Sequence, residues 1–172
     1  MLVMLSEYSD YNKKQKDNAM KPLIRYEIAK VTDIYLFQDI LKEVYGKSPW
    51  SNTIFWLELT KRQQSLYVKA VHGSEVLGFI GVRVMNTDAH ITNLAVLPKY
   101  QHHGIGKQLL VESLIFAKNN KCLTMSLEVK KTNYRAINLY KNFGFYINGI
   151  KPKYYKEDQE DAVDMFLTLE ES

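Results

Sequence analysis

An aliphatic stretch that stops at a proline and is followed by two closely spaced glycines constrains this chain more than any other feature. Residues 91–97, ITNLAVL, have the composition of a β-strand, and Pro98 ends that strand because it cannot donate a ladder hydrogen bond. Gly104 and Gly106 then stand at the start of a segment that runs to about Asn119 and predicts a helix. The chain must therefore pass from a strand, through a short loop, into the N-terminus of a helix.

The two glycines lie where a helix can bind an anion. Free backbone N–H groups and the positive end of the helix dipole converge at such a start, and the absence of side chains lets an anion come close. The sequence therefore predicts a phosphate cradle, to which we expect His102 and His103 to contribute N–H groups rather than imidazole chemistry. The alternative is a glycine that only caps the helix, with solvated histidines beside it.

Hydrophobic periodicity and turn residues predict regular elements along the rest of the chain. We expect Thr32 and Ser51 to cap the first two helices and Gly46 to end the first. Three strands joined by turns at 72–75 and 86–88 are expected to form an antiparallel meander. The expected order is a strand at 23–29, helices at 33–45 and from 52, three strands within 66–97, a helix at 104–119, a strand at 123–129, a helix at 133–142, and strands at 145–151 and 162–169.

Composition and cysteine usage limit the class of protein. A chain of 172 residues with 46% hydrophobic and 24% charged residues suits one soluble domain, which we place at 21–172. Residues 1–20 show no sustained period and are expected to form a flexible extension, or to follow a wrongly assigned start. The single cysteine, Cys122, cannot form an internal disulfide, which favours the cytoplasm. No apolar run reaches the roughly 20 residues of a membrane helix, so no membrane partner is expected.

Metal and nucleic-acid sites lack support in the sequence. His72 and His90 are expected in or beside turns and are far apart, and no Cys/His/Asp spacing suggests a metal, so none is predicted. The net charge of +4 permits an anionic ligand but decides nothing. Without an aromatic-basic motif or a helix-turn-helix pattern, direct nucleic-acid binding is not expected.

Two longer segments carry a family resemblance. NLAVLPKYQHHGIGKQLL (93–110) and LEVKKTNYRAINLYKNFGF (127–145) together resemble the acetyl-CoA-binding core of the GCN5-related N-acetyltransferases, over roughly residues 21–169. The resemblance implies an α/β (α+β) fold with a mixed, mostly antiparallel sheet, splayed central parallel strands and about four helices. It also implies acetyl-CoA as the co-substrate, with no metal.

The resemblance assigns cofactor-binding residues at the matching positions. Backbone groups on the first splayed strand would contact the acetyl end and the pantetheine, the cradle would receive the pyrophosphate, and one residue would bind from the second helix. These residues are Leu94, Ala95 and Val96 on the strand, His102, His103, Gly104, Ile105, Gly106 and Lys107 in the cradle, and Asn133 at the second helix.

Three further segments are similar to one branch of that family, the bacterial ribosomal-protein alanine N-acetyltransferases. They are SPWSNTIF (48–55), SLEVKKTNYRAINLY (126–140) and KYYKEDQEDAVDMFLTL (153–169). This similarity implies Glu128 as general base, Tyr140 as general acid, and the N-terminus of a small-subunit ribosomal protein as acceptor partner. It also implies that Trp50, Tyr154 and Tyr155 line the acceptor groove, although such aromatics could equally close the edge of the core.

The residues themselves support this chemistry in part. An α-amino group with a pKa of about 7.7 to 8.0 is roughly one tenth neutral at pH 7, so one carboxylate base suffices for it, whereas lysine is almost wholly protonated. Glu128 stands in an apolar strand, where desolvation in a cleft would raise its pKa toward a useful value. The alternatives are a solvated glutamate at a strand end and, for Tyr140, a half-buried core aromatic.

Three functions stay open from the sequence alone. The first is acetylation of a protein N-terminus, by direct transfer because Cys122 has no histidine partner nearby in the sequence. The second is acetylation of a small amine such as a polyamine or an aminoglycoside-like antibiotic. The third is a non-catalytic acyl-CoA sensor or a basic nucleic-acid-binding module that keeps the fold.

Overall fold

The computed structural model describes residues 23–48, 50–61 and 64–169. The expected extension at 1–20 lies outside the described residues, and so does Pro49 of the SPWSNTIF segment. Within the described part of the chain, no helix is both long and apolar enough to cross a membrane.

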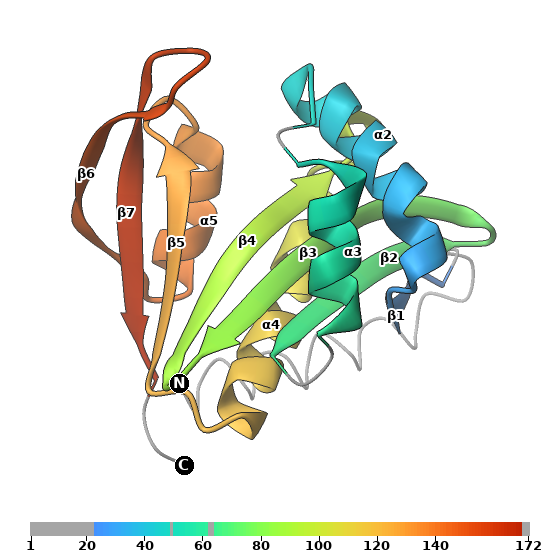
Figure 1. Cartoon of the computed structure of the whole chain (residues 1–172), viewed down its shortest axis with the longest axis horizontal. Helices are drawn as coiled ribbons and strands as arrows, with labels where there is room; N and C mark the ends of the chain where they lie inside the picture. The colour runs from blue at the N-terminus through green and yellow to red at the C-terminus, as the bar shows by residue number, and fades with distance from the viewer. Residues whose placement is uncertain (1–22, 49, 62–63, 170–172) are drawn as a thin grey trace.

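A seven-stranded sheet with the order β1-β2-β3-β4-β5-β7-β6 forms the centre of the molecule (Figure 1). Every neighbouring pair is antiparallel except β4 and β5, which are parallel. The expected meander and the expected mixed sheet are therefore both confirmed. The strands are β1 (Arg25–Ile28), β2 (Ser65–His72), β3 (Glu75–Met85), β4 (Asp88–Val96), β5 (Thr124–Lys130), β6 (Tyr146–Tyr155) and β7 (Glu160–Thr168).

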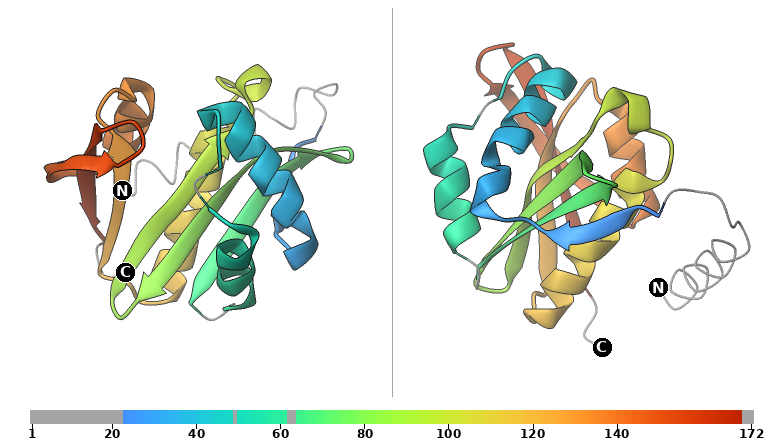
Figure 2. Two further views of the ribbon diagram at one scale, coloured as in Figure 1. Left: turned by 45° about the horizontal axis from the view of Figure 1, so that its top comes forward. Right: turned by 90° about the vertical axis from the view of Figure 1, so that its right-hand side faces the viewer.

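Helices cover both faces of the sheet (Figure 2). One face carries α2 (Ile34–Tyr45) and α3 (Asn52–Thr60), and the other carries α4 (Ile105–Asn119) and α5 (Tyr134–Asn142). Each face has its own core. Phe37, Phe55 and Phe79 are fully buried under α2 and α3, with the rings of Phe37 and Phe79 stacked at 4.1 Å. Aliphatic side chains fill the core under α4 and α5.

Two of the three residues expected to begin or end a helix do so in the structure. Gly46 ends α2 with a left-handed φ of 77°, and the Ser51 side chain caps α3 by accepting the N–H of Ile54 at 3.3 Å. Thr32 does not cap α2, because a 3-10 turn over Val31–Asp33 precedes that helix. The carboxylate of Asp33 stabilises this turn by accepting a hydrogen bond from the backbone N–H of Lys30 at 2.8 Å.

The central parallel strands separate along their length, as expected. β4 and β5 pair only over Asp88–Ile91 and Thr124–Leu127. Beyond that point β4 stays with β3 and β5 stays with β7, so a gap opens between them in Figure 1. A bulge in β4 at Thr92, where the register with β3 shifts, marks the start of this separation, since bulges bend a strand and increase its twist.

Candidate active site

The separated part of β4 directs backbone groups into the gap. The N–H of Leu97 donates to the carbonyl of Leu77 on β3 at 2.9 Å. Because the backbone groups of successive residues in a strand point to alternate sides, those of Ala95 also face β3. The backbone groups of Leu94 and Val96 therefore face the gap. Of the three backbone contacts predicted on this strand, two therefore face the gap. Ala95 instead completes the ladder with β3.

Side chains cap both of the carbonyls that face the gap. Gln101 donates from Nε2 to the Val96 carbonyl at 2.9 Å, and Tyr45 donates from its hydroxyl to the Leu94 carbonyl at 2.9 Å. Tyr45 is the last residue of α2 and was not identified from the sequence. Its helical register marked it only as an exposed position, and its proximity to β4 depends on how α2 crosses the sheet.

The predicted cradle has the geometry of an open helix start. His102 and Gly104 both adopt left-handed φ values, 67° and 80°, and α4 begins with no side-chain cap. A Cβ added at Gly106 would meet no atom closer than 3.8 Å, so this glycine leaves space rather than relieving a clash. The side chain of Ile105 is buried in the core and anchors the turn, and Lys107 is exposed beside it.

The two cradle histidines lie at the surface of the loop before α4. Both imidazoles are exposed, and Nδ1 of His103 lies 2.8 Å from the backbone oxygen of Gln101. Their main chain forms the turn before α4, and the expected contribution of their N–H groups to an anion stays a prediction. Across the gap, Asn133 stands at the start of α5 and caps it with its side chain.

Glu128 lies on the polar face of β5. Met125, Leu127 and Val129 point into the core, so the alternating residues, Glu128 among them, face the opposite side of the sheet. Its side chain is 13% exposed, with Oε1 2.5 Å from Nζ of Lys151 and Oε2 3.2 Å from Nε2 of His90.

These contacts reverse the expected pKa of the predicted base. The hydrogen bond from His90 is the largest cause and the bond from Lys151 adds to it, and together they outweigh desolvation and lower the pKa of Glu128 to about 2. Desolvation does act to raise this pKa, but the expected net rise was wrong, because the sequence did not show the two donors that β4 and β6 bring to the carboxylate.

His90 is the second residue that sequence reasoning missed. It was expected in or beside a turn, but it lies inside β4 opposite Ser126 of β5. Its neighbours Ala89 and Ile91 are buried in the α4 core, which places His90 on the same polar face as Glu128. The alternation of apolar and polar residues in DAHI was the available signal.

Three phenols converge on the gap from three elements. Tyr140 of α5 is buried, with its ring 5.6 Å from that of Phe145, and its pKa is raised first by desolvation and then by the neighbouring Tyr45 and Tyr155. Tyr155 of β6 donates to the backbone oxygen of Glu128 at 3.4 Å. Tyr155 therefore contacts the backbone of Glu128 and also lies close enough to Tyr140 to affect its pKa.

The remaining predicted groove residues separate into two places. Tyr154 packs against Tyr155 with ring centroids 5.2 Å apart, beside the Lys151 ammonium, at a bulge where β6 loses register with β7. Trp50 instead packs on Phe55 with ring centroids 5.3 Å apart, at the edge of the α2 and α3 core. The structure thus brings Tyr154 and Tyr155 to Glu128 and gives Trp50 the core-edge position.

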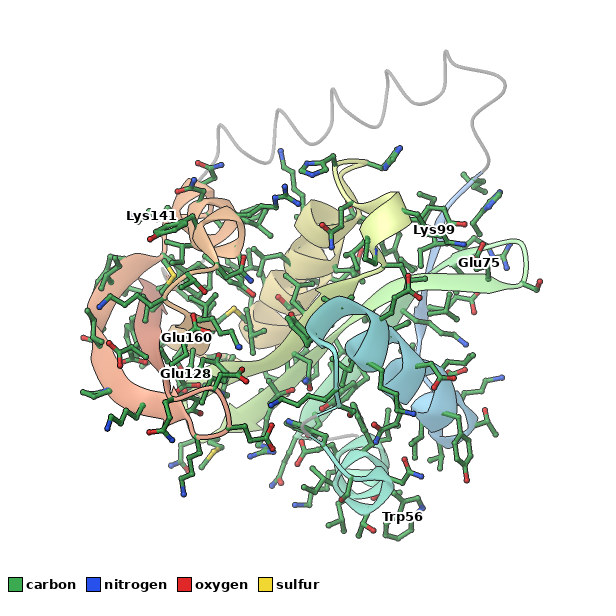
Figure 3. All side chains as sticks on the ribbon, turned by 90° about the horizontal axis from the view of Figure 1, so that it is seen from above. Trp56, Glu75, Lys99, Glu128, Lys141 and Glu160 are labelled. Atoms are coloured by element: carbon green, nitrogen blue, oxygen red, sulfur yellow. The ribbon has the colours of Figure 1, made fainter. Side chains whose placement is uncertain are left out.

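Ion pairs join the segment just after α2, and also β5, to the turn between β6 and β7. Lys47, just after α2, pairs with Glu157 and with Asp158 in the turn between β6 and β7. Lys130 of β5 pairs with the same Asp158 and, at 3.1 Å, with Glu160. Figure 3 shows Glu128 and Glu160 on the half of the molecule formed by β5, β6 and β7. The residue just before SPWSNTIF therefore pairs with the KYYKEDQEDAVDMFLTL segment, and Lys130 of the SLEVKKTNYRAINLY segment pairs with that same segment.

Metal ligation has no counterpart in the described part of the chain. Across residues 23–48, 50–61 and 64–169, no group of three or more His, Cys, Asp or Glu side chains is arranged to hold a metal ion.

Comparisons with known proteins agree with this geometry. Residues 30–145 match the model of the Acetyltransferase (GNAT) family. A Bacillus subtilis protein, provisionally named a ribosomal protein bS18-alanine N-acetyltransferase, is 33% identical over 124 residues, covering 72% of this chain and 82% of that protein. The Escherichia coli (strain K12) protein named a ribosomal protein bS18-alanine N-acetyltransferase is 30% identical over 123 residues, covering 70% and 82%.

A solved structure extends the likeness to the fold. The crystal structure of the ribosomal-protein-S18-alanine N-acetyltransferase from Escherichia coli superimposes with a TM-score of 0.78 at 26% sequence identity. The superposition covers 87% of this chain and 96% of that chain.

Proposed function

The chain belongs to the GNAT family of acetyltransferases, and we propose that it acetylates the N-terminal α-amine of a protein, with alanine as the first residue. It is an N-acetyltransferase that uses acetyl-CoA. The Bacillus subtilis and Escherichia coli relatives carry names that specify alanine of the small-subunit ribosomal protein bS18, and we propose an acceptor of this class, reached in the cytoplasm.

The residues around the gap fit acetyl-CoA. The backbone groups of Leu94 and Val96 form an unpaired strand edge along which the pantetheine arm would lie. The uncapped start of α4, opened by Gly104 and Gly106, would receive the pyrophosphate. Tyr45 and Gln101 now cap the two carbonyls of that edge, so binding would exchange those hydrogen bonds for new ones.

The observation that carries the proposal is that Tyr155 lies near both predicted residues: its hydroxyl donates to the backbone oxygen of Glu128 at 3.4 Å, and it helps to raise the pKa of the buried Tyr140. The acceptor ammonium loses a proton toward the Glu128 carboxylate, and the neutral nitrogen then forms a bond to the thioester carbon. The carbon–sulfur bond breaks, and Tyr140 gives its phenolic proton to the departing sulfur. Because its pKa is raised, Tyr140 is protonated at neutral pH and ready for this step.

The charges around the gap favour one amine over a polycation. Lys151 lies against Glu128 and Asp164, while Lys130 lies against Asp158 and Glu160, so most of the local carboxylates already have a positive partner. A polyamine would need several free carboxylates. A single α-amine needs one base, and its pKa of about 7.7 to 8.0 lies well below that of lysine.

The side-chain oxygen of Asn93 offers a hydrogen-bond acceptor for the substrate amine. Oδ1 of Asn93 is buried, and it has no hydrogen-bond partner among the residues that the structure describes. Asn93 lies on β4 beyond the bulge, on the face that Ala95 shares with α2 and α3. We propose that it accepts an N–H from the acceptor amine, which would satisfy an otherwise costly group.

A competition among acceptors tests the proposal. Purified enzyme and labelled acetyl-CoA are mixed with three acceptors at equal concentration: Ala-starting peptides from small-subunit ribosomal proteins, an N-terminally blocked lysine peptide, and spermidine. We expect the label almost entirely on the Ala-starting peptides. Preference for spermidine would instead support a small-amine acetyltransferase, and binding of CoA without transfer to any amine would support a sensor.

A further inference from the structure

The side chain of Gln101 joins β4 to α5. Its Nε2 donates to the backbone oxygen of Val96 at 2.9 Å, and its Oε1 accepts from Nη1 of Arg135 at 3.0 Å. The carboxamide of Gln101 therefore uses its donor on the strand edge that faces the gap and its acceptor on the helix that follows β5.

This carboxamide stands where an amide of pantetheine would bind. The Val96 carbonyl belongs to the part of β4 that has separated from β5, along which we place the pantetheine arm. Pantetheine contains amide groups, each with an N–H donor and a carbonyl acceptor, and the side chain of Gln101 offers the same two kinds of atom. Gln101 thus makes a hydrogen bond to β4 that the cofactor would otherwise make.

The guanidinium of Arg135 has no carboxylate partner among the residues that the structure describes. Arg25 and Arg83, the other arginines in this part of the chain, each pair with a glutamate. Arg135 lies in the first turn of α5, where the helix dipole disfavours a positive charge, and that turn contains no acidic side chain. The position therefore suits an anion that comes from outside the chain.

Arg135 lies beside the predicted pyrophosphate cradle. A Cβ at Gly106 would lie 3.8 Å from Cδ2 of Leu139 and 3.8 Å from Cγ2 of Val96, so α5, β4 and the first turn of α4 meet at this glycine. Arg135 precedes Leu139 by one helical turn and lies on the same side of α5. Its hydrogen-bond partner, Gln101, directly precedes the cradle in the sequence.

We propose that Gln101 is an internal substitute for a pantetheine amide, and that CoA displaces its side chain and releases Arg135 to bind a phosphate of the cofactor. This inference rests on the proposed function for the place of acetyl-CoA, but not for the identity of the acceptor. In the exchange, Arg135 gives up a hydrogen bond to a neutral amide oxygen and gains a stronger one to a charged phosphate oxygen.

The exchange makes Gln101 and Arg135 determinants of cofactor specificity. A pantetheine thioester without phosphate would break the bonds of Gln101 and leave Arg135 without a partner. A phosphate without pantetheine would take Arg135 from Gln101 and make no use of the strand edge. Only a ligand that carries both parts replaces every hydrogen bond that it displaces, so the pair favours the complete cofactor over its fragments.

Two ligands that differ in their phosphates test the displacement. The side-chain amide and guanidinium signals of ¹⁵N-labelled enzyme are followed as CoA or pantetheine is added to saturation, and Gln101→Ala and Arg135→Ala assign the two signals. We expect the Gln101 signal to move with both ligands. The Arg135 N–H should become protected from exchange with water only with CoA. A Gln101 signal that stays in place at saturation with CoA would overturn the displacement.

Two substitutions at position 101 test the competition through their opposite effects. Gln101→Ala removes the internal substitute, so we expect it to bind CoA about three- to tenfold more tightly, measured by calorimetry. Gln101→Glu gives Arg135 a carboxylate within the chain and repels the phosphates, so we expect binding at least about tenfold weaker. Gln64→Ala, at an exposed glutamine just before β2, is the matched control. Weaker CoA binding in Gln101→Ala would make Gln101 a ligand of CoA and would overturn the inference.

Loss of the guanidinium should weaken binding of the phosphates alone. We expect Arg135→Ala to bind CoA about tenfold more weakly, or weaker still, and to bind pantetheine no more weakly than the wild-type enzyme. Arg135→Lys keeps the charge without the planar fork and should lie between the two. Arg25→Ala removes an arginine on β1 that is paired with Glu27, and is the matched control. Equal CoA affinities of Arg135→Ala and Arg25→Ala would overturn the role of Arg135.

These measurements require no acceptor, so they separate the inference from the proposed function. Transfer of acetyl groups to an amine other than an N-terminal one would change the proposed acceptor and leave the results for Gln101 and Arg135 intact. A wild-type enzyme that binds CoA with an unmoved Gln101 would overturn the inference and leave the acceptor proposal standing. Failure to bind CoA at all would overturn the cofactor site, and the inference with it.

Discussion

Oδ1 of Asn133 accepts the backbone N–H of Ala136 at 3.1 Å, which makes a predicted cofactor-binding residue the N-cap of α5. Asn133→Ala should therefore lower stability by about 1 kcal/mol, whatever its role toward CoA. Asn133→Ser keeps a capping oxygen but loses the amide donor. We expect near-normal stability and several-fold weaker CoA binding in Asn133→Ser, measured by calorimetry. If Asn133→Ser binds CoA with normal affinity, Asn133 acts only as the N-cap of α5 and does not bind CoA.

The close approach of β3 to β4 requires a glycine at position 78. A Cβ at Gly78 would lie 2.5 Å from the backbone oxygen of Ala95 and 2.9 Å from Cα of Val96, and a backbone clash cannot be relieved by turning a side chain. Gly78→Ala should lower the free energy of unfolding by about 1–3 kcal/mol and weaken CoA binding at the adjacent edge. Gly149→Ala is the control, since its Cβ would meet nothing within 4 Å. Equal stability of the two variants in urea denaturation would contradict this packing.

Tyr140→Phe removes the hydroxyl group of Tyr140 and keeps its aromatic ring. The ring packs on Phe145, so its shape is kept and stability should change by no more than about 0.5 kcal/mol. We expect kcat to fall by about 10²-fold with unchanged CoA affinity, because only the proton for the departing sulfur is lost. Tyr146→Phe, on the exposed side of β6, is the matched control and should keep full activity. A Tyr140→Phe enzyme with the wild-type kcat would remove Tyr140 from the chemistry.

The low pKa of Glu128 should be visible in acid stability. Its folded pKa of about 2 lies below the ordinary 4.5, so its stabilising contribution is present above pH 4.5 and is lost as the pH falls toward 2. The loss amounts to at most about 3 kcal/mol. Urea denaturation at pH 5 and pH 2.5 should show a smaller drop for Glu128→Gln than for the wild-type protein. Glu75→Gln is the comparison: Lys99 and Tyr100 also lower the pKa of Glu75, but this carboxylate is exposed and screened by solvent, so its removal should reduce the drop by less than Glu128→Gln does.

The sequence alone was sufficient for the parts of the fold that depend on local chemistry. Gly46 and Ser51 mark helix ends through their own backbone and side-chain preferences, and the glycines before α4 predicted its open start. Thr32 does not cap α2 because the 3-10 turn over Val31–Asp33 precedes that helix, and Asp33 of this turn also accepts a hydrogen bond from a residue far away in the chain, Lys69 of β2, at 2.9 Å. No local pattern contains that contact.

The site depended on pairings between distant segments. His90 meets Ser126 and Glu128 only through the parallel register of β4 and β5, which joins residues 36 positions apart. Lys151 reaches Glu128 from β6. Because the pKa of Glu128 is set by these partners, its direction could not be read from the apolar strand around it. Only the identity of the carboxylate was available from the sequence.

One peptide that carries two competing amines tests the central claim most directly. The peptide begins with alanine and contains one internal lysine, and fragment masses locate the acetyl group after reaction with limiting enzyme and acetyl-CoA near pH 7.5. We expect the acetyl group on the alanine nitrogen in nearly all of the product, and none in a parallel reaction with Glu128→Gln at the same enzyme concentration and time. Acetylation mainly at the lysine, or equal yields with Glu128→Gln, would contradict an N-terminal acetyltransferase that uses the Glu128 side of the gap.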